Sequence, residues 1–186
     1  MTSRAALTAA ALLFSAAAGS AAAADWKTLP GSTLAFASSM QGEAFTGRFA
    51  RFTPVLRFDP AQLAGARFDV SIDLTSVETK NAERDEGLKS MEFFNTKAQP
   101  KARYVATTFR ALGGGRYVAD GTLTLNGHSK AVPLAFTWTG GAKPVLAGSA
   151  TVKRLDFGVG TGEWADTGLL PDAVRITTRL LLAPAK

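Results

Sequence analysis

Apolar and polar residues alternate along most of the chain. In the segment 66–75, ARFDVSIDLT, every second residue from Phe68 to Leu74 is apolar, and the residues between them are charged or carry a hydroxyl group. The segments 131–139 and 172–182 repeat this period of two. Such alternation predicts β-strands with one buried and one solvated face, which is typical of an antiparallel sheet.

The pattern predicts eight strands in all. They lie near residues 33–40, 45–58, 66–76, 101–111, 116–125, 129–139, 145–156 and 172–182. Turn residues separate several of them, above all Asn126-Gly127, because both residues of such a pair readily adopt the positive φ of a two-residue hairpin loop. Within the second strand the apolar positions change from odd to even near Ala50-Arg51, which predicts a β-bulge or a sharp bend.

One segment departs from the β pattern. Residues 81–90, NAERDEGLKS, are charged and rich in helix formers, so they predict a short helix or helical turn. Neither a repeat nor a linker divides the chain, and we expect one domain. Eight antiparallel strands form either a sandwich or a barrel. Long strands and a single helical insert favour an all-β, eight-stranded antiparallel barrel with one short helical insert.

The N-terminal segment has the features of a secretory signal. Arg4 supplies a positive charge, residues 5–18 form a short apolar run, and residues 21–24 are the small residues of a cleavage zone. The run is shorter than the roughly 20 apolar residues that span a bilayer. We therefore interpret residues 1–24 as a signal peptide rather than a retained anchor, and we expect residues 25–186 to form the mature domain in the periplasm.

Composition and charge narrow the classes of function. The chain has no cysteine, which excludes disulfides, zinc–thiolate sites and cysteine nucleophiles. Its 21 Lys and Arg residues against 15 Asp and Glu residues give a formal net charge of +6. The basic residues are dispersed singly, which indicates a solvated surface, and we expect no nucleic-acid partner.

Few residues offer catalytic or metal-binding chemistry. The sole histidine, His128, follows the Asn-Gly turn without any nucleophile motif, so an exposed histidine is favoured over a catalytic one. The charge run 83–86 fits a solvated helix face better than an acid–base pair. The glycine run 158–162 lacks the lysine and the helix of a phosphate-binding loop. We predict no catalysis, no metal site and no cofactor.

The remaining chemistry is apolar. The chain contains 12 Phe, 3 Trp and 2 Tyr residues, most of them on predicted strands or beside the helical insert. An eight-stranded barrel either fills its interior with such side chains or leaves room for one small ligand. Periodicity does not distinguish a filled interior from a hollow one.

Five groups of short motifs follow one another between residues 34 and 182. They are RFDP at 57–60, IDLTSVET at 72–79 with ERD at 83–85, MEFFN at 91–95 with Pro100, GTLTLNG at 121–127 with KAVPL at 130–134, and RLDFG at 154–158 with DAVRI at 172–176. Each is weak alone. Together, in this order and spacing, they resemble the YceI family of polyisoprenoid-binding periplasmic proteins.

The resemblance implies a lipocalin-like extended barrel whose tunnel binds and transports a long-chain isoprenoid lipid, either a polyprenyl chain or a quinone. Residues 160–166, GTGEWAD, are similar to a subgroup often encoded beside, or fused to, cytochrome b561-type membrane proteins, which suggests such a partner and favours a quinone. Many members carry histidines where this chain has Gly31-Ser32 and Gly87, so its head-group contacts must differ. For self-association we expect a homodimer, the commonest soluble oligomer.

Strand phase assigns the lipid contacts. We expect the tail to lie against Phe36, Phe45, Phe49, Phe68, Ile72, Phe136, Trp138 and Ile176, with Met91, Phe93 and Phe94 at the capped end and with Tyr104 and Trp164 as a polar edge near an opening. Two other hypotheses compete with a lipid carrier. One is an enzyme that acts on the same lipid, and the other is a filled barrel that serves as a stress-response or structural module without lipid cargo.

Overall fold

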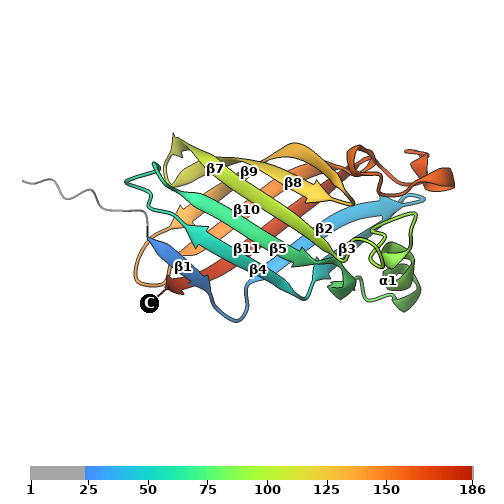
Figure 1. Ribbon diagram of the computed structural model, residues 1–186, viewed down its shortest axis with the longest axis horizontal. Coiled ribbons are helices and arrows are strands. Elements are labelled where there is room, and N and C mark those ends of the chain that lie inside the picture. The colour runs from blue at the N-terminus through green and yellow to red at the C-terminus, as the bar shows by residue number, and fades with distance from the viewer. Residues whose placement is uncertain (1–23, 186) are drawn as a thin grey trace, which may run out of the picture.

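Eleven strands make up most of residues 24–185, which are the residues that the computed structural model describes (Figure 1). The strands are β1 (Asp25–Thr28), β2 (Thr33–Met40), β3 (Glu43–Phe49), β4 (Phe52–Arg57), β5 (Arg67–Asp73), β6 (Val77–Glu78), β7 (Lys101–Gly113), β8 (Arg116–Leu125), β9 (His128–Thr139), β10 (Val145–Lys153) and β11 (Ala173–Pro184). The helices are α1 (Ala82–Lys89) and the short 3-10 helices η1 (Leu74–Ser76), η2 (Arg154–Phe157) and η3 (Gly162–Ala165). The predicted signal peptide, apart from Ala24, lies outside the described residues.

Pairing between β1 and β11 closes the sheet into a barrel. The order β1-β4-β5-β7-β8-β9-β10-β11 forms a ring of eight antiparallel strands, in which Trp26 on β1 lies opposite Pro184 on β11. β2 also pairs with β11, and β3 pairs with β2 and β6, so these strands extend the ring toward the end that carries α1. The predicted eight-stranded antiparallel barrel with one short helix is confirmed.

The structure corrects the predicted strand boundaries in three places. The predicted strand 45–58 is two strands, because the chain bends between β3 and β4. At the bend, the N–H groups of Ala50 and Arg51 donate to the carbonyl and the hydroxyl of Ser76, both at 3.0 Å. β1 was missed because four residues are too few to show a period of two. The predicted strand 145–156 ends earlier, where η2 begins.

Local sequence signals determine the β8–β9 turn and the helix. Asn126 and Gly127 both have positive φ, 50° and 78°, as the predicted two-residue turn requires. α1 begins after Asn81, whose side-chain oxygen accepts a hydrogen bond of 2.9 Å from the Arg84 N–H. Leu88 is the buried residue of this helix. The helix therefore packs on the barrel at the end opposite β1 (Figure 1).

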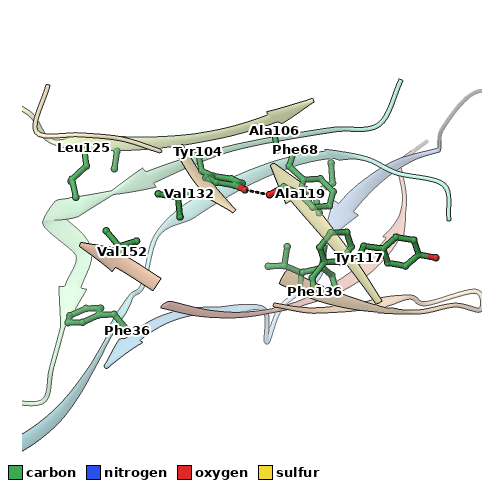
Figure 2. Close-up of a cluster of buried hydrophobic side chains, with 14 of the residues drawn as sticks. Phe36, Phe68, Tyr104, Ala106, Tyr117, Ala119, Leu125, Val132, Phe136 and Val152 are labelled. Carbon is green, nitrogen blue, oxygen red and sulfur yellow. Dashed lines mark hydrogen bonds between the residues drawn. The ribbon is translucent and has the colours of Figure 1, made fainter. Parts of the chain in front are cut away.

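Aromatic side chains fill the end of the barrel near β1. Phe58 is fully buried, and its ring centroid lies between 4.9 and 5.9 Å from those of five other rings. These rings are Phe68, Phe109, Tyr117, Phe136 and Trp138. Figure 2 shows Phe68, Tyr117 and Phe136 together at one end of the drawn core, with Phe36 at the other. This aromatic cluster, Phe58 with its five neighbours, closes one end of the barrel.

The outer face of β5 carries a carboxylate held by two guanidinium groups. Asp69 accepts hydrogen bonds from Arg103, at 2.6 and 2.8 Å, and from Arg67, at 2.8 Å. The hydrogen bonds from Arg103, with a further contribution from Arg67, lower the pKa of Asp69 from 3.8 to about 2. Because this pKa is lower in the folded state than in the unfolded state, the interactions stabilise the fold above about pH 4, and this stabilisation is lost as the pH falls toward 2.

We expect Asp69→Asn to lower the free energy of unfolding at pH 7 by about 1 kcal/mol, because both arginines are largely exposed and solvent screens the pairs. The difference from the wild type should shrink as the pH falls from 4 toward 2. Urea denaturation at a series of pH values measures it. Glu43→Gln is the control, since Glu43 is exposed and forms no ion pair with any residue between 24 and 185. A difference that stays constant over this range would contradict the role of Asp69.

Candidate functional site

Beyond the aromatic cluster the barrel is hollow. A cavity of about 510 Å³ extends from Phe68 to the residues of α1, and its volume lies within the roughly 300–1,000 Å³ that is typical of small-molecule sites. Alternate residues of each strand face inward, and most of those that line the cavity are apolar. The period of two that predicts the strands therefore also builds the cavity wall.

Ten of the thirteen predicted lipid contacts line this cavity. They are Phe36, Phe45, Phe49, Phe68, Ile72, Phe93, Phe94, Tyr104, Trp164 and Ile176. Most lie on strands, where the phase of the pattern places them inward, whereas Phe93, Phe94 and Trp164 come from the connections at the helical end. The structure brings these side chains together, and their contact with a lipid stays a prediction.

Phe136 and Trp138 do not line the cavity, because they belong to the aromatic cluster. The Tyr117 ring stacks on Phe136 with a centroid distance of 5.4 Å, and Trp26 meets Trp138 edge to face, also at 5.4 Å. Both predicted residues point inward, as their strand phase indicates. Phase gives the face of the sheet but not the position along the barrel axis, and these two residues lie at the filled end.

The segment after α1 directs its side chains in two ways. Phe94 packs against Phe49 at a centroid distance of 5.9 Å, and Phe93 packs against Trp164 at 5.7 Å. Met91, which we expected beside them, is 77% exposed and does not line the cavity. This segment is made of turns, so it has no period from which the direction of a side chain follows.

Tyr104 lies in the cavity wall and not at an opening, which corrects its predicted place. Its hydroxyl donates a hydrogen bond of 3.1 Å to the Ala119 carbonyl (Figure 2). Its ring lies so close to Gly121 that a Cβ atom at this position would overlap it. Burial raises the pKa of Tyr104 well above its usual range, so the phenol is neutral at physiological pH. With its hydroxyl engaged, Tyr104 does not provide the free polar edge that we predicted.

Two polar side chains that the sequence did not single out also line the cavity. Ser38 Oγ and Arg84 Nε are buried and have no hydrogen-bond partner among residues 24–185. Arg84 Cζ lies 4.4 Å from the ring centroid of Phe45. The charge run 83–86 is therefore not wholly a solvated helix face. The signal was present, because Arg84 precedes the buried Leu88 by four residues, and this spacing places both on one face of a helix.

A third polar residue, Arg154, is 3% exposed and lies in the wall as the first residue of η2. Its guanidinium group donates to the backbone carbonyls of Val159 (2.9 Å), Gly160 (2.9 Å), Leu170 (2.6 Å) and Pro171 (3.1 Å). Four of its five N–H donors are thus used. Burial lowers the pKa of Arg154 from its ordinary value. This side chain ties the connection between η2 and β11 to the barrel and is not free to bind a ligand.

The remaining candidate chemistry lies apart from the cavity. His128 is exposed at the start of β9 and does not line the cavity. Between residues 24 and 185, no group of three side chains is arranged to hold a metal ion. No helix in this part of the chain is long and apolar enough to cross a membrane. His128 and the cavity residues therefore do not share a site.

Comparison with known proteins identifies the family. Residues 26–182, which form the barrel, match the family model of the YceI-like domain. The chain belongs to the YceI-like family. Protein YceI of Escherichia coli O157:H7 is 35% identical to this YceI-like protein in an alignment of 167 positions, and the match covers 83% of this chain and 85% of that protein.

Solved structures show the same architecture. The crystal structure of Burkholderia cenocepacia BcnA is similar with a TM-score of 0.77 and 30% sequence identity, and the match covers 81% of this chain and 95% of BcnA. A polyisoprenoid-binding domain from Saccharophagus degradans is similar with a TM-score of 0.66, over 88% of this chain and 99% of that domain. At 19% identity, the second likeness shows the fold alone. The barrel of this protein is thus the YceI-like fold.

Proposed function

We propose that this YceI-like protein binds the long apolar tail of an isoprenoid lipid in its cavity and carries out no catalysis. The observation that supports this function best is the cavity itself, which is mostly apolar and lies inside a closed barrel. Exposing such a tail to water costs about 0.8 kcal/mol per CH₂ group. A wall of phenylalanine and aliphatic side chains removes much of this cost.

The position of the aromatic cluster sets the orientation of the bound lipid. Because the cluster fills the barrel near β1, the cavity ends there, and its other end lies at α1, Phe93 and Trp164. A tail that enters at the helical end therefore points toward the aromatic cluster, and its head group stays near α1.

The same physics limits what a carrier of this kind does. The hydrocarbon core of a membrane is as apolar as the cavity wall, so transfer into the cavity gains little free energy. We propose that the protein lowers the free-energy cost of moving the lipid through an aqueous compartment, and that this compartment is the periplasm. The choice between a polyprenyl chain and a quinone, the cytochrome b561-type partner and the homodimer all stay predictions.

The two competing hypotheses have less support. The aromatic cluster fills only one end of the barrel, whereas a structural module without cargo would have no use for a cavity of about 510 Å³ at the other end. An enzyme that acts on the lipid would need a proton donor or nucleophile at the cavity. His128, its best candidate, does not line the cavity. The Ser38 hydroxyl does line it, but within residues 24–185 it has no hydrogen-bond partner that could act as its base, and Glu83 is exposed.

Native mass spectrometry tests the proposed function. The protein is purified from its own host, sprayed without denaturation, and extracted with organic solvent to identify what it held. We expect one isoprenoid or quinone per chain and no chemical change in an added lipid. Protein that emerges empty and takes up neither a polyprenyl lipid nor a quinone would favour the module without cargo.

A further inference from the structure

Among residues 24–185, two buried polar groups without hydrogen-bond partners are both neighbours of Phe45, which lines the cavity. Ser38 on β2 is directly opposite Phe45 on β3, so both side chains are on the inner face of the barrel. Arg84 stacks on the same Phe45 ring from α1, at 4.4 Å. Within residues 24–185, Ser38 Oγ and Arg84 Nε are the two buried side-chain atoms that lack a hydrogen bond. Their common location at one ring indicates a polar site at the helical end of the cavity.

The charge of Arg84 has no counter-ion in the described part of the chain. The neighbouring Asp85 carboxylate accepts hydrogen bonds from the N–H and the hydroxyl of Thr79, at 2.7 and 2.6 Å. Glu86 pairs with Lys89 at 2.8 Å. Asp85 and Glu86 are thus engaged elsewhere, and Glu83, the third acidic residue of the run, forms no ion pair with Arg84. A partly buried guanidinium group without an anion is costly, and the cation–π contact with Phe45 compensates only part of that cost.

Space is available beside these donors. Gly87 lines the cavity, and a Cβ atom at this position would meet nothing within 4 Å beyond its chain neighbours and the backbone of its own helix. Glu83 also lines the cavity, but it is exposed, so solvent screens its charge. A head group at the helical end would therefore meet Arg84 and Ser38 without a clash and without strong repulsion.

We propose that Arg84 and Ser38 form a head-group site for an anionic isoprenoid, with a phosphate as the acceptor. This inference rests on the proposed binding of the tail, which directs the head group to α1. A guanidinium group binds phosphate oxygens through two parallel charge-assisted hydrogen bonds, which are shorter and stronger than neutral ones. The Ser38 hydroxyl donates a further hydrogen bond to the same group. Arg84 thereby selects for charge, and the apolar wall selects for the tail.

Two lipids with the same tail test the site. Geranylgeranyl phosphate and geranylgeraniol differ only in the head group, and isothermal titration calorimetry gives their Kd values with the full-length protein. We expect the wild type to bind the phosphate at least tenfold more tightly than the alcohol. Arg84→Gln should weaken phosphate binding about tenfold and change alcohol binding less than twofold. Ser38→Ala should weaken phosphate binding about threefold. Arg84→Lys keeps the charge but not the two parallel donors of the guanidinium group, so it should keep part of the preference for the phosphate over the alcohol.

A surface arginine supplies the matched control. Arg48 on β3 pairs with Glu78 on the outside of the barrel, so Arg48→Gln should leave both affinities unchanged. Inorganic phosphate at the same concentration should displace neither lipid, because it lacks the tail. Equal affinity of the wild type for both lipids, or an Arg84→Gln variant that keeps the full preference for the phosphate, would overturn the head-group site and leave the binding of the tail intact. Failure of the wild type to bind either lipid would overturn both proposals.

Discussion

Replacing Ala150 by tryptophan should nearly abolish lipid uptake. Ala150 lies on β10 opposite Ile176 on β11, and both residues line the cavity. An indole group there would occupy the space that we assign to the tail and displace about four CH₂ groups. At about 0.8 kcal/mol for each group, the loss is about 3 kcal/mol, or roughly 100-fold in Kd. Titration of wild type and variant with a fluorescent polyprenyl lipid measures this loss.

The same strand offers the control for this experiment. Ala147 is exposed on the outer face of β10, so Ala147→Trp adds the same side chain without filling the cavity. We expect this variant to bind lipid within twofold of the wild type. Urea denaturation shows whether either variant is unstable, since overpacking typically costs about 1–3 kcal/mol. If Ala150→Trp is stably folded and binds lipid as the wild type does, the tail lies outside this cavity.

The alternating pattern was enough to predict most of the strands and which of their residues face inward, whereas the choice of a barrel over a sandwich rested on the strand lengths, the helical insert and the family resemblance. Phe36, Ile72 and Ile176 could be placed inside because the period of a strand is two and one face must be buried. The same phase is shared by Phe136, which lies in the aromatic cluster instead of the cavity. Which end of a barrel is filled depends on the order of the strands around the ring. The alternation of residues within one strand does not reveal that order.

The polar part of the site was harder to predict because it depends on the direction of single side chains. Arg84 belongs to a run of four charged residues, and such runs are usually solvated. The other residue of the site, Ser38, cannot be distinguished in the sequence from any other serine on a strand. Its role follows only from the positions of β3 and α1 in the fold. Arg154 donates its four hydrogen bonds to backbone carbonyl groups. Because every residue has a backbone carbonyl, no sequence motif indicates these hydrogen bonds.

Replacing Arg154 by methionine should destabilise this protein strongly. Methionine keeps much of the length and apolar character of the side chain but none of its donors. The carbonyls of Val159, Gly160, Leu170 and Pro171 would lose their hydrogen bonds, and each buried acceptor left without a partner costs about 1–3 kcal/mol. Relaxation of the surrounding backbone would reduce this cost in part. We therefore expect the free energy of unfolding, measured by urea denaturation, to fall by about 3–5 kcal/mol.

Arg175 on β11 provides the comparison for Arg154. It is exposed, and Arg175→Met should change the free energy of unfolding by less than about 0.5 kcal/mol. Arg154→Lys restores the charge with three donors on one atom and should lie between methionine and the wild type. A loss below about 1 kcal/mol for Arg154→Met would show that the connection between η2 and β11 holds its place without this side chain.

The effect of Arg154→Met should also reach the cavity. Val159, Trp164 and Leu170 line the helical end and belong to the connection that Arg154 holds. Hydrogen exchange in this variant should therefore accelerate first in residues 159–171, while the β8 and β9 amides stay protected. Faster lipid release from a barrel that is still folded would follow, because the end wall is loosened and the aromatic cluster at the other end is not.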